Sequence, residues 1–280
     1  MLMNMKELLK VADEKGFAVP AFNIGSDQLL KAVMQQVKEM KRPVILEMSP
    51  DEFNFVENSL VQSMIYEASK TDVPVVIHLD HGDKYETVVR AIQAGFTSVM
   101  IDASKLPYEE NIAITQKVCE VAHLANVSVE SELGTIGTTG IIYTDPDQAK
   151  DFVEKTGIDT LAVAIGTAHG IYPSDMKPEL RLDILQTLKD TLDIPLVLHG
   201  GSSNKDEEIA KAVKIGISKI NISSDIKVAF YEKCREVLNA HPEYREPLEI
   251  YPEPIKACRE VIAHKVNLFD SADKVKYYYE

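Results

Sequence analysis

The sequence predicts a single α/β domain, a (β/α)8 TIM barrel, that spans residues 1–280. Eight short runs rich in apolar and β-branched residues recur along the chain and alternate with stretches of helical periodicity. The runs are almost continuously apolar, which is typical of parallel strands covered by helices. Eight is also the number of strand-helix units that closes such a barrel, so a doubly wound open sheet is the alternative that we favour less.

The expected elements follow one another along the whole chain. Strands are expected at residues 17–23, 44–48, 75–79, 98–101, 127–131, 160–165, 196–198 and 219–222. Helices are expected at residues 26–40, 85–94, 109–125, 147–156, 205–215 and 252–270. In AGFTSVMID, TGIDTLAVA and IGISKINIS a glycine that ends a helix leads straight into a strand, as short helix-to-strand connections require. The last residues, 274–280, are expected to be loose.

Charge and cysteine content limit the class of protein. The formal net charge of -14 argues against nucleic acid or an anionic membrane as a partner, because phosphates in bulk need a basic surplus. Cys119, Cys234 and Cys258 are odd in number and widely spaced, which predicts free thiols in a reducing compartment. The N-terminus is amphipathic instead of apolar, and no apolar run is long enough to cross a bilayer. We therefore expect a cytoplasmic protein.

Three histidines each follow an expected strand and precede a glycine. They are His81 in VVIHLDHG, His169 in LAVAIGTAHG and His199 in PLVLHGGS. Because the strands of a barrel end at one mouth, these distant imidazoles would converge there. Three neutral imidazoles suit a tetrahedral Zn²⁺ whose fourth position is open to substrate. One histidine at a strand end is more often a hydrogen-bonded loop residue, but three with the same neighbours favour a metal site. His78 lies inside its strand, and we expect it either to support the metal ligands or to pack in the core.

Other polar residues at the expected strand ends would surround the metal. Asp80 stands beside His81, and Asp102, Glu130 and Glu132 end the next two strands. These last three carboxylates either support the metal ligands or bind the metal themselves. Backbone N–H groups and hydroxyls after the expected seventh and eighth strands predict a phosphate site, because barrels often hold phosphate there.

Taken together, HLDHG, VESELG, AIGTAHG, LVLHGGS and KINISSD resemble the class II, zinc-dependent ketose-bisphosphate aldolases. The resemblance covers nearly the whole chain, in order. It implies reversible cleavage of a ketose 1,6-bisphosphate into dihydroxyacetone phosphate and glyceraldehyde 3-phosphate. Fructose 1,6-bisphosphate is favoured, with tagatose 1,6-bisphosphate or another ketose phosphate as the alternative. The family also implies a homodimer or homotetramer.

The resemblance implies a role for each site residue. The residue matching Asp80 is the catalytic acid and base, and those matching His81, His169 and His199 bind zinc. Asp102 and Glu132 match a second metal position that shares the first histidine. A monovalent cation, Na⁺ or K⁺, is often bound nearby. The residues matched to substrate binding are Ser49, Gly170, Gly200, Gly201, Ser202, Asn221, Ile222, Ser223 and Ser224.

The chemistry of the residues agrees with this resemblance. Aldol cleavage requires a stabilised carbanion, which either a lysine Schiff base or a Lewis-acid metal provides. We identify no lysine at a strand end in surroundings that would depress its pKa, so the metal route is favoured. Asp80 would take the proton from the hydroxyl at carbon 4 during cleavage. A zinc-dependent barrel hydrolase and a non-catalytic phosphosugar-binding protein are the rival hypotheses.

The chain departs from the family after the ELG motif. Family members usually carry a longer, glycine-rich loop with an acidic residue, but no carboxylate falls between Glu132 and Asp145. Either another group takes that role or a segment is missing between Gly140 and Ile141. We favour the second explanation, and an intact mass that matches 280 residues would exclude it. For the second phosphate the candidates are Lys177, Arg259 and Lys265.

Overall fold

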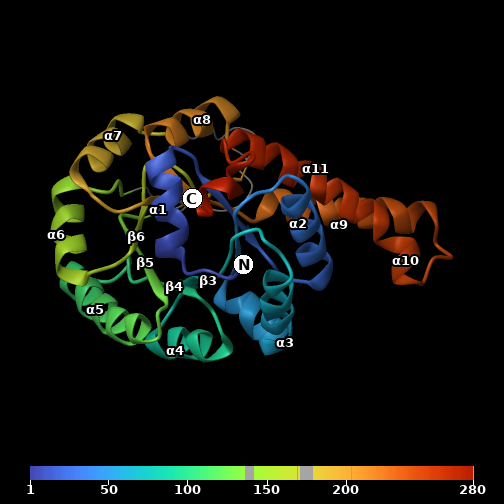
Figure 1. Cartoon of the computed structure of the whole chain (residues 1–280), viewed down its shortest axis with the longest axis horizontal. Helices are drawn as coiled ribbons and strands as arrows, with labels where there is room; N and C mark the ends of the chain where they lie inside the picture. Colours follow the sequence, from blue (N-terminus) through green and yellow to red (C-terminus); the bar gives the residue numbers. More distant parts are fainter. Residues whose placement is uncertain (136–141, 169, 171–178, 203, 280) are drawn as a thin grey trace.

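The computed structural model describes residues 1–135, 142–168, 170, 179–202 and 204–279 (Figure 1). Eight parallel strands form a closed barrel in chain order, and β8 pairs with β1 to close it. The predicted single-domain TIM barrel is therefore confirmed. The strands are β1 (Val19–Asn23), β2 (Val44–Met48), β3 (Val75–Gly82), β4 (Ser98–Ile101), β5 (Ser128–Leu133), β6 (Thr160–Val163), β7 (Leu196–Leu198) and β8 (Ile217–Ile222).

Helices surround the barrel, and most of those expected from the sequence lie within two residues of their predicted bounds. They are α1 (Met5–Lys15), α2 (Asp27–Glu39), α3 (Pro50–Ser69), α4 (Tyr85–Ala94), α5 (Tyr108–Leu124), α6 (Pro146–Thr156), α7 (Leu182–Thr191), α8 (Asp206–Ile215), α9 (Ser224–Ala240), α10 (Pro247–Ile250) and α11 (Pro252–Leu268). The sequence analysis gave no bounds for α1, α3, α7, α9 or α10, although α9 carries part of the site.

The strands alternate between two environments, as period-two side chains must. In β1, Phe22 packs in the large hydrophobic cluster between strands and helices, whereas Val19 and Ala21 belong to a second cluster inside the barrel. Leu8 and Leu9 of α1 complete this second cluster. Helix α1 therefore closes the end of the barrel at which the strands begin, and the opposite end stays available for the site.

The end of the chain is ordered, so the prediction of a loose tail is wrong for residues 274–279. A 3-10 helix covers Lys274–Tyr278, and the hydroxyl of Tyr278 donates to the carbonyl of Leu8 at 3.0 Å. Tyr277 and Tyr278 also pack against the cluster that α1 closes. The aromatic rings gain enough buried contact to hold a segment that composition alone made look mobile.

A hairpin of helices extends from one side of the barrel (Figure 1). Helix α9 leaves the mouth after β8, and α11 returns beside it and packs against α2. In the described part of the chain, no helix is both long and apolar enough to span a bilayer.

Candidate active site

Asp80 and His81 are consecutive residues of β3 that both reach the mouth of the barrel. Neighbouring side chains of a regular strand point to opposite faces. Here the pairing of β3 with β4 shifts register between Leu79 and Gly82, and His81 has a φ of 111°, which side-chain-bearing residues rarely adopt. As a result, three donor atoms, one each from Asp80, His81 and His199, lie within 4.8 Å of one another.

The glycine after His81 makes this bulge possible. A Cβ at Gly82 would lie 2.4 Å from the carbonyl oxygen of Met100 in β4. The glycine after His199 is restricted in the same way, because a Cβ at Gly200 would lie 2.4 Å from the carbonyl oxygen of Ala168. The glycines after His81 and His199 therefore allow close backbone approach beside the imidazole, whereas a Cβ at Gly170 would meet open space and only its φ of 94° favours glycine.

The imidazoles of His81 and His199 face each other across the mouth. His81 Nε2 lies 2.9 Å from His199 Nδ1, and the rings meet edge to face with centroids 4.6 Å apart. The other ring nitrogens contact carboxylates: His81 Nδ1 lies 3.0 Å from Asp102, and His199 Nε2 lies 2.7 Å from Glu130. If each carboxylate accepts an N–H, the two facing nitrogens carry lone pairs, which is the arrangement of metal-binding histidines.

The electrostatic potential around the imidazoles of His81 and His199 is negative. Burial would lower the pKa of His81, but Asp80, the hydrogen bond to Asp102 and nearby Glu132 outweigh burial and raise this pKa to about 10. The same hydrogen bond helps to hold the pKa of the Asp102 carboxyl well below its usual range, against the effect of burial. A site that retains a proton so strongly also favours a cation of higher charge.

The donor set at the mouth fits a divalent metal ion at two overlapping positions, and a third group of close donors, Glu47, His78 and Asp80, is buried beside them. The first combines Asp80, His81 and His199, and the second combines His81 with Asp102 and Glu132, each with donor atoms within 4.8 Å. The second group is the shared-histidine position that the resemblance implied. Two imidazoles with carboxylates are ligands that zinc accepts. The third predicted ligand, His169, lies outside the described residues, as does the loop at Gly140 and Ile141.

Two asparagines hold the carboxylate of Asp80. Asn221 Nδ2 donates to one oxygen at 2.9 Å, and Asn23 Nδ2 donates to the other at 3.3 Å. Burial would raise the pKa of Asp80, but its electrostatic interactions with His81, His199 and Lys219 and the hydrogen bond from Asn23 lower it to about 2. The carboxylate is therefore ionised at neutral pH. Asn23 is the last residue of β1, so the strand-end rule could have identified it.

A buried ionic cluster inside the barrel supports the site. Lys219 of β8 is fully buried, and its ammonium lies 3.0 and 3.1 Å from the two oxygens of Glu130 and 3.6 Å from Glu47. Burial would lower the pKa of Lys219, but Glu130, Glu47 and Asp80 outweigh it and raise the pKa. This lysine, which the sequence analysis missed in mid-strand, stays protonated and is unsuited to Schiff-base chemistry.

The remaining histidines have neighbours of their own. His78 is buried with Nδ1 2.9 Å from Ser98 Oγ and Nε2 3.9 Å from Glu130, and the supporting or packing role expected for it stays a prediction. His123 pairs with Asp159 at 2.8 Å. His264 pairs with Asp206 at 3.0 Å and His241 approaches Glu243 at 3.5 Å, both on exposed surfaces. Ser104, which the sequence analysis missed, donates to Asp102 at 2.7 Å and to Glu132 at 3.3 Å.

A cavity of about 200 Å³ opens beside Asp80 at the ends of β1, β2, β7 and β8. Its lining includes most of the residues predicted to bind substrate. The described lining residues are Asn23, Ser49, Glu52, Asp80, Gly170, Gly200, Ser202, Asn221, Ser223, Ser224 and Lys227. Asn23, Glu52 and Lys227 were not predicted.

Two residues predicted to bind substrate have other contacts. The N–H of Gly201 donates to the carbonyl of Asn221 at 3.1 Å, and a Cβ at Gly201 would lie 2.4 Å from a methyl group of Ile220. Gly201 therefore lets the loop after β7 lie on β8. The side chain of Ile222 is fully buried in the hydrophobic core, so it offers only backbone to a ligand.

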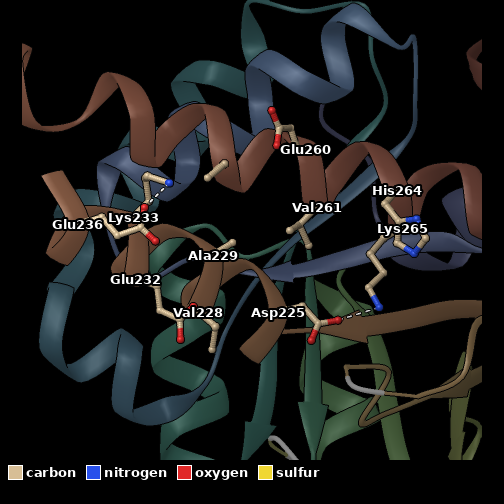
Figure 2. A pocket seen from close by; sticks show the side chains of 11 residues that line it. Asp225, Val228, Ala229, Glu232, Lys233, Glu236, Glu260, Val261, His264 and Lys265 are labelled. Carbon is tan, nitrogen blue, oxygen red and sulfur yellow. Dashed lines mark hydrogen bonds and ion pairs between the residues drawn. The ribbon is translucent and has the colours of Figure 1, made fainter.

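The candidates for a second phosphate are already paired. Figure 2 shows Lys265 of α11 pointing at Asp225 of α9, with the charged atoms 2.7 Å apart. Arg259 contacts Gln36 at 2.9 Å and pairs with Glu39. The first pair joins the two helices of the hairpin and the second joins α11 to α2, and none of these residues lines the cavity beside Asp80. Lys177 lies outside the described residues.

Comparisons with known proteins give one consistent relationship. The sequence profile described as "Fructose-bisphosphate aldolase class-II" matches residues 3–274. A relative from Bacillus subtilis named "Probable fructose-bisphosphate aldolase" is 39% identical over 285 residues, covering 98% of this chain and 99% of its own. A fructose-bisphosphate aldolase from Staphylococcus aureus is 39% identical over 287 residues, with the same coverage. The crystal structure of the YdjI aldolase from Escherichia coli K12 matches with a TM-score of 0.87 and 35% identity, covering 98% of this chain and 100% of that one.

Proposed function

The chain belongs to the class II fructose-bisphosphate aldolase family and is an aldehyde-lyase, and from this premise we propose how its own residues carry out the reaction. The substrate proposed is a ketose 1,6-bisphosphate, cleaved reversibly into dihydroxyacetone phosphate and glyceraldehyde 3-phosphate. The observation that carries the proposal is the facing pair of His81 and His199 beside the ionised carboxylate of Asp80.

The resident metal proposed is zinc. His81, His169 and His199 would hold it at the catalytic position, and Asp102 and Glu132 would hold it at the second position with His81. The support is the donor set, together with the carboxylates that orient both described imidazoles. When bound, zinc supplies a Lewis acid that polarises the keto group of the substrate.

Asp80 is the proposed proton acceptor. Its ionised carboxylate would take the proton from the hydroxyl at carbon 4 as the bond between carbons 3 and 4 breaks, and return it in the reverse direction. Hydrogen bonds from Asn23 and Asn221 hold one oxygen each, which limits rotation of the carboxylate. A positioned base is worth more than a mobile one because the reacting atoms must meet within hydrogen-bond distance.

The triose-phosphate end of the substrate is proposed to lie against the loops after β6, β7 and β8. Helix α9 begins there with Ser224, so the partial positive charge of its N-terminus favours an anion. A monovalent cation near this phosphate, Na⁺ or K⁺, is proposed from the family resemblance alone. The proposed contacts are Gly170, Gly200, Ser202, Asn221, Ser223 and Ser224, with Ser49 at the other side of the cavity and backbone only from Gly201 and Ile222.

Fructose 1,6-bisphosphate is the favoured substrate because the relatives from Bacillus subtilis and Staphylococcus aureus carry that substrate in their names. Tagatose 1,6-bisphosphate differs only in the configuration at carbon 4 and is the alternative. Steady-state kinetics on the two epimers, measured side by side, will distinguish them.

The cellular setting follows the family. We propose a cytoplasmic enzyme of carbohydrate metabolism, acting in glycolysis, that is a homodimer or homotetramer with residues 1–280 as one domain. Free cysteines agree with a reducing compartment.

A coupled assay of purified protein tests the mechanism. Cleavage of fructose 1,6-bisphosphate is followed by detecting the triose products, with and without a chelator, and with the variant Asp80→Ala. We expect activity to disappear on full zinc removal and to fall by about 10²- to 10⁴-fold in the variant, the range for loss of a general base. Cleavage that survives complete zinc removal, or full activity in Asp80→Ala, would show the mechanism to be wrong.

A further inference from the structure

Lys227 is a cation in the cavity that neither the sequence motifs nor the family resemblance assigned. It lies in the first turns of α9, and its side chain is about one-third exposed. Among the described residues that line the cavity, it is the single lysine or arginine. A phosphate in the cradle formed by Gly200, Ser202, Ser223 and Ser224 would therefore lie close to this ammonium.

The ammonium of Lys227 is held in place by two oxygens. It donates to Glu52 Oε1 at 2.6 Å and to Ser223 Oγ at 2.9 Å. An ammonium has three N–H donors, and in the described part of the chain these are its two hydrogen-bond acceptors, so one donor remains for a ligand. Because Ser223 belongs to the cradle, this donor is available at the edge of the proposed phosphate position.

Glu52 is itself anchored, so it can fix the position of Lys227. Its other carboxylate oxygen accepts the N–H of Ser49 at 2.9 Å and the amide of Asn23 at 3.2 Å. Asn23 also donates to Asp80. Glu52 thus connects the proposed phosphate-binding cation to the catalytic carboxylate through one amide group.

Lys227 lies near the N-terminus of α9, an end of a helix that interacts unfavourably with cations. The N-terminal turn of a helix carries a partial positive charge and normally attracts acidic residues. Asp225 follows that preference, and its pairing with Lys265 of α11 fixes the start of α9 (Figure 2). Lys227 does not follow it. A cation near the start of this helix, at the edge of an anion cradle, fits a role in binding better than a role in helix stability.

The charges of the cavity give Lys227 a further effect. Glu52 and Asp80 are the acidic residues among its described lining, and both would repel a phosphate. The ammonium offsets the charge of Glu52 directly. Without it, an uncompensated carboxylate would remain in the cavity that the phosphate enters.

From these contacts we propose that Lys227 is a substrate-binding residue that donates to the phosphate in the cradle, and that Glu52 positions its ammonium. This inference rests on the proposed function, since it extends the same cradle by one residue. It adds a pair of residues that determine preference for a phosphorylated substrate.

Calorimetry on the zinc-loaded protein tests the proposal with dihydroxyacetone phosphate and with dihydroxyacetone as probes. Lys227→Met should weaken binding of dihydroxyacetone phosphate by about 10- to 100-fold, the effect of losing one charge-assisted hydrogen bond. Binding of dihydroxyacetone should change less than twofold. Equal losses for both probes, or no loss for the phosphate, would overturn the proposal.

Lys38→Met is the matched control. Lys38 and Glu67 form a pair of 2.7 Å with about one-third of each side chain exposed, close to the geometry of Lys227 with Glu52, but they lie in the last turns of α2 and α3. This variant should bind both probes as the wild type does. A loss as large as that of Lys227→Met would assign the effect to general destabilisation and overturn the proposal.

A variant of Glu52 that keeps its shape but removes its charge separates the effect of charge from that of hydrogen bonding. Glu52→Gln should bind dihydroxyacetone phosphate as tightly as the wild type or more tightly, and Lys227→Met/Glu52→Gln should recover part of the affinity lost in Lys227→Met. No recovery in the double variant would contradict the charge compensation proposed between Lys227 and Glu52. Wild-type protein that binds dihydroxyacetone phosphate but cleaves no bisphosphate would contradict the proposed function and leave this inference standing.

Discussion

At the scale of single residues, the site depends on which atom of each histidine is already occupied. Glu130 and Asp102 each contact one ring nitrogen, which leaves the other nitrogens of His199 and His81 facing each other where we propose that the metal binds. Lys219 in turn holds Glu130. These are buried, charge-assisted contacts, so removing one member leaves the others without compensation.

We predict that Glu130→Gln weakens zinc binding by about 10- to 100-fold, the usual cost of losing a group that orients a metal-binding histidine. Competition with a chromophoric chelator measures it. The double variant Glu130→Gln/Lys219→Met removes the stranded buried charge and shows whether a folding defect is responsible. Glu67→Gln, in an exposed pair, is the control. Zinc affinity within twofold of the wild type in both Glu130 variants would contradict the prediction.

Thiol reactivity is a second property of single residues. Burial raises the pKa of Cys119 and of Cys258 to about 12, with a contribution from Asp159 at Cys119, while Cys234 is only half-buried. A thiol is protonated below its pKa, so at pH 8 only about 1 in 10⁴ of the two buried thiols is reactive thiolate. We predict one fast thiol with Ellman's reagent at pH 8, abolished by Cys234→Ser, and three after denaturation. Two or more fast thiols in the native protein would contradict it.

At the scale of elements, the bulge in β3 is the feature that brings two consecutive residues into one site. It requires a glycine at position 82, because β4 leaves no room for a Cβ there. The sequence predicted the end of this strand at residue 79, but pairing with β4 extends it to Gly82. When the bounds of a strand are predicted from apolar residues alone, the predicted strand ends before the polar residues that form the site.

We predict that Gly82→Ala destabilises the protein by about 1 to 3 kcal/mol, the range for overpacking, and weakens zinc binding as His81 moves. Gly157→Ala is the control. Gly157 follows α6 with a φ of 70° and has open space around it. The substitution Gly157→Ala therefore costs only the strain of an alanine in this backbone conformation. Thermal unfolding and zinc titration measure both effects. If the two variants bind zinc equally well, the bulge does not determine the position of His81.

At the scale of the whole molecule, the two ends of the barrel have separate tasks. Helix α1 and the final tyrosines cover the end where the strands begin, and the ionisable groups gather at the other end. Stability and chemistry are thereby separated, as expected for this fold.

This separation predicts that Tyr278→Ala lowers stability without changing the site. Loss of the half-buried ring and of the bond to Leu8 should cost about 2 to 3 kcal/mol, at the lower end of the range of large-to-small substitutions. Tyr278→Phe keeps the packing and should cost about 1 kcal/mol. Denaturant unfolding measures both, and zinc stoichiometry should stay that of the wild type. Loss of zinc in Tyr278→Ala would show that the two ends are coupled.

The sequence by itself determined the barrel and the positions of the groups at its mouth. Strand alternation, helical periodicity and glycine caps are local, so they can be read from neighbouring residues, and the strand-end rule then identified Asp80, His81 and His199. Only the tertiary structure decided the partners. Glu130 is 69 residues from His199, Lys219 is 89 from Glu130, and Lys227 is 175 from Glu52. No local pattern encodes these pairings, because they arise only when barrel closure brings distant strands face to face.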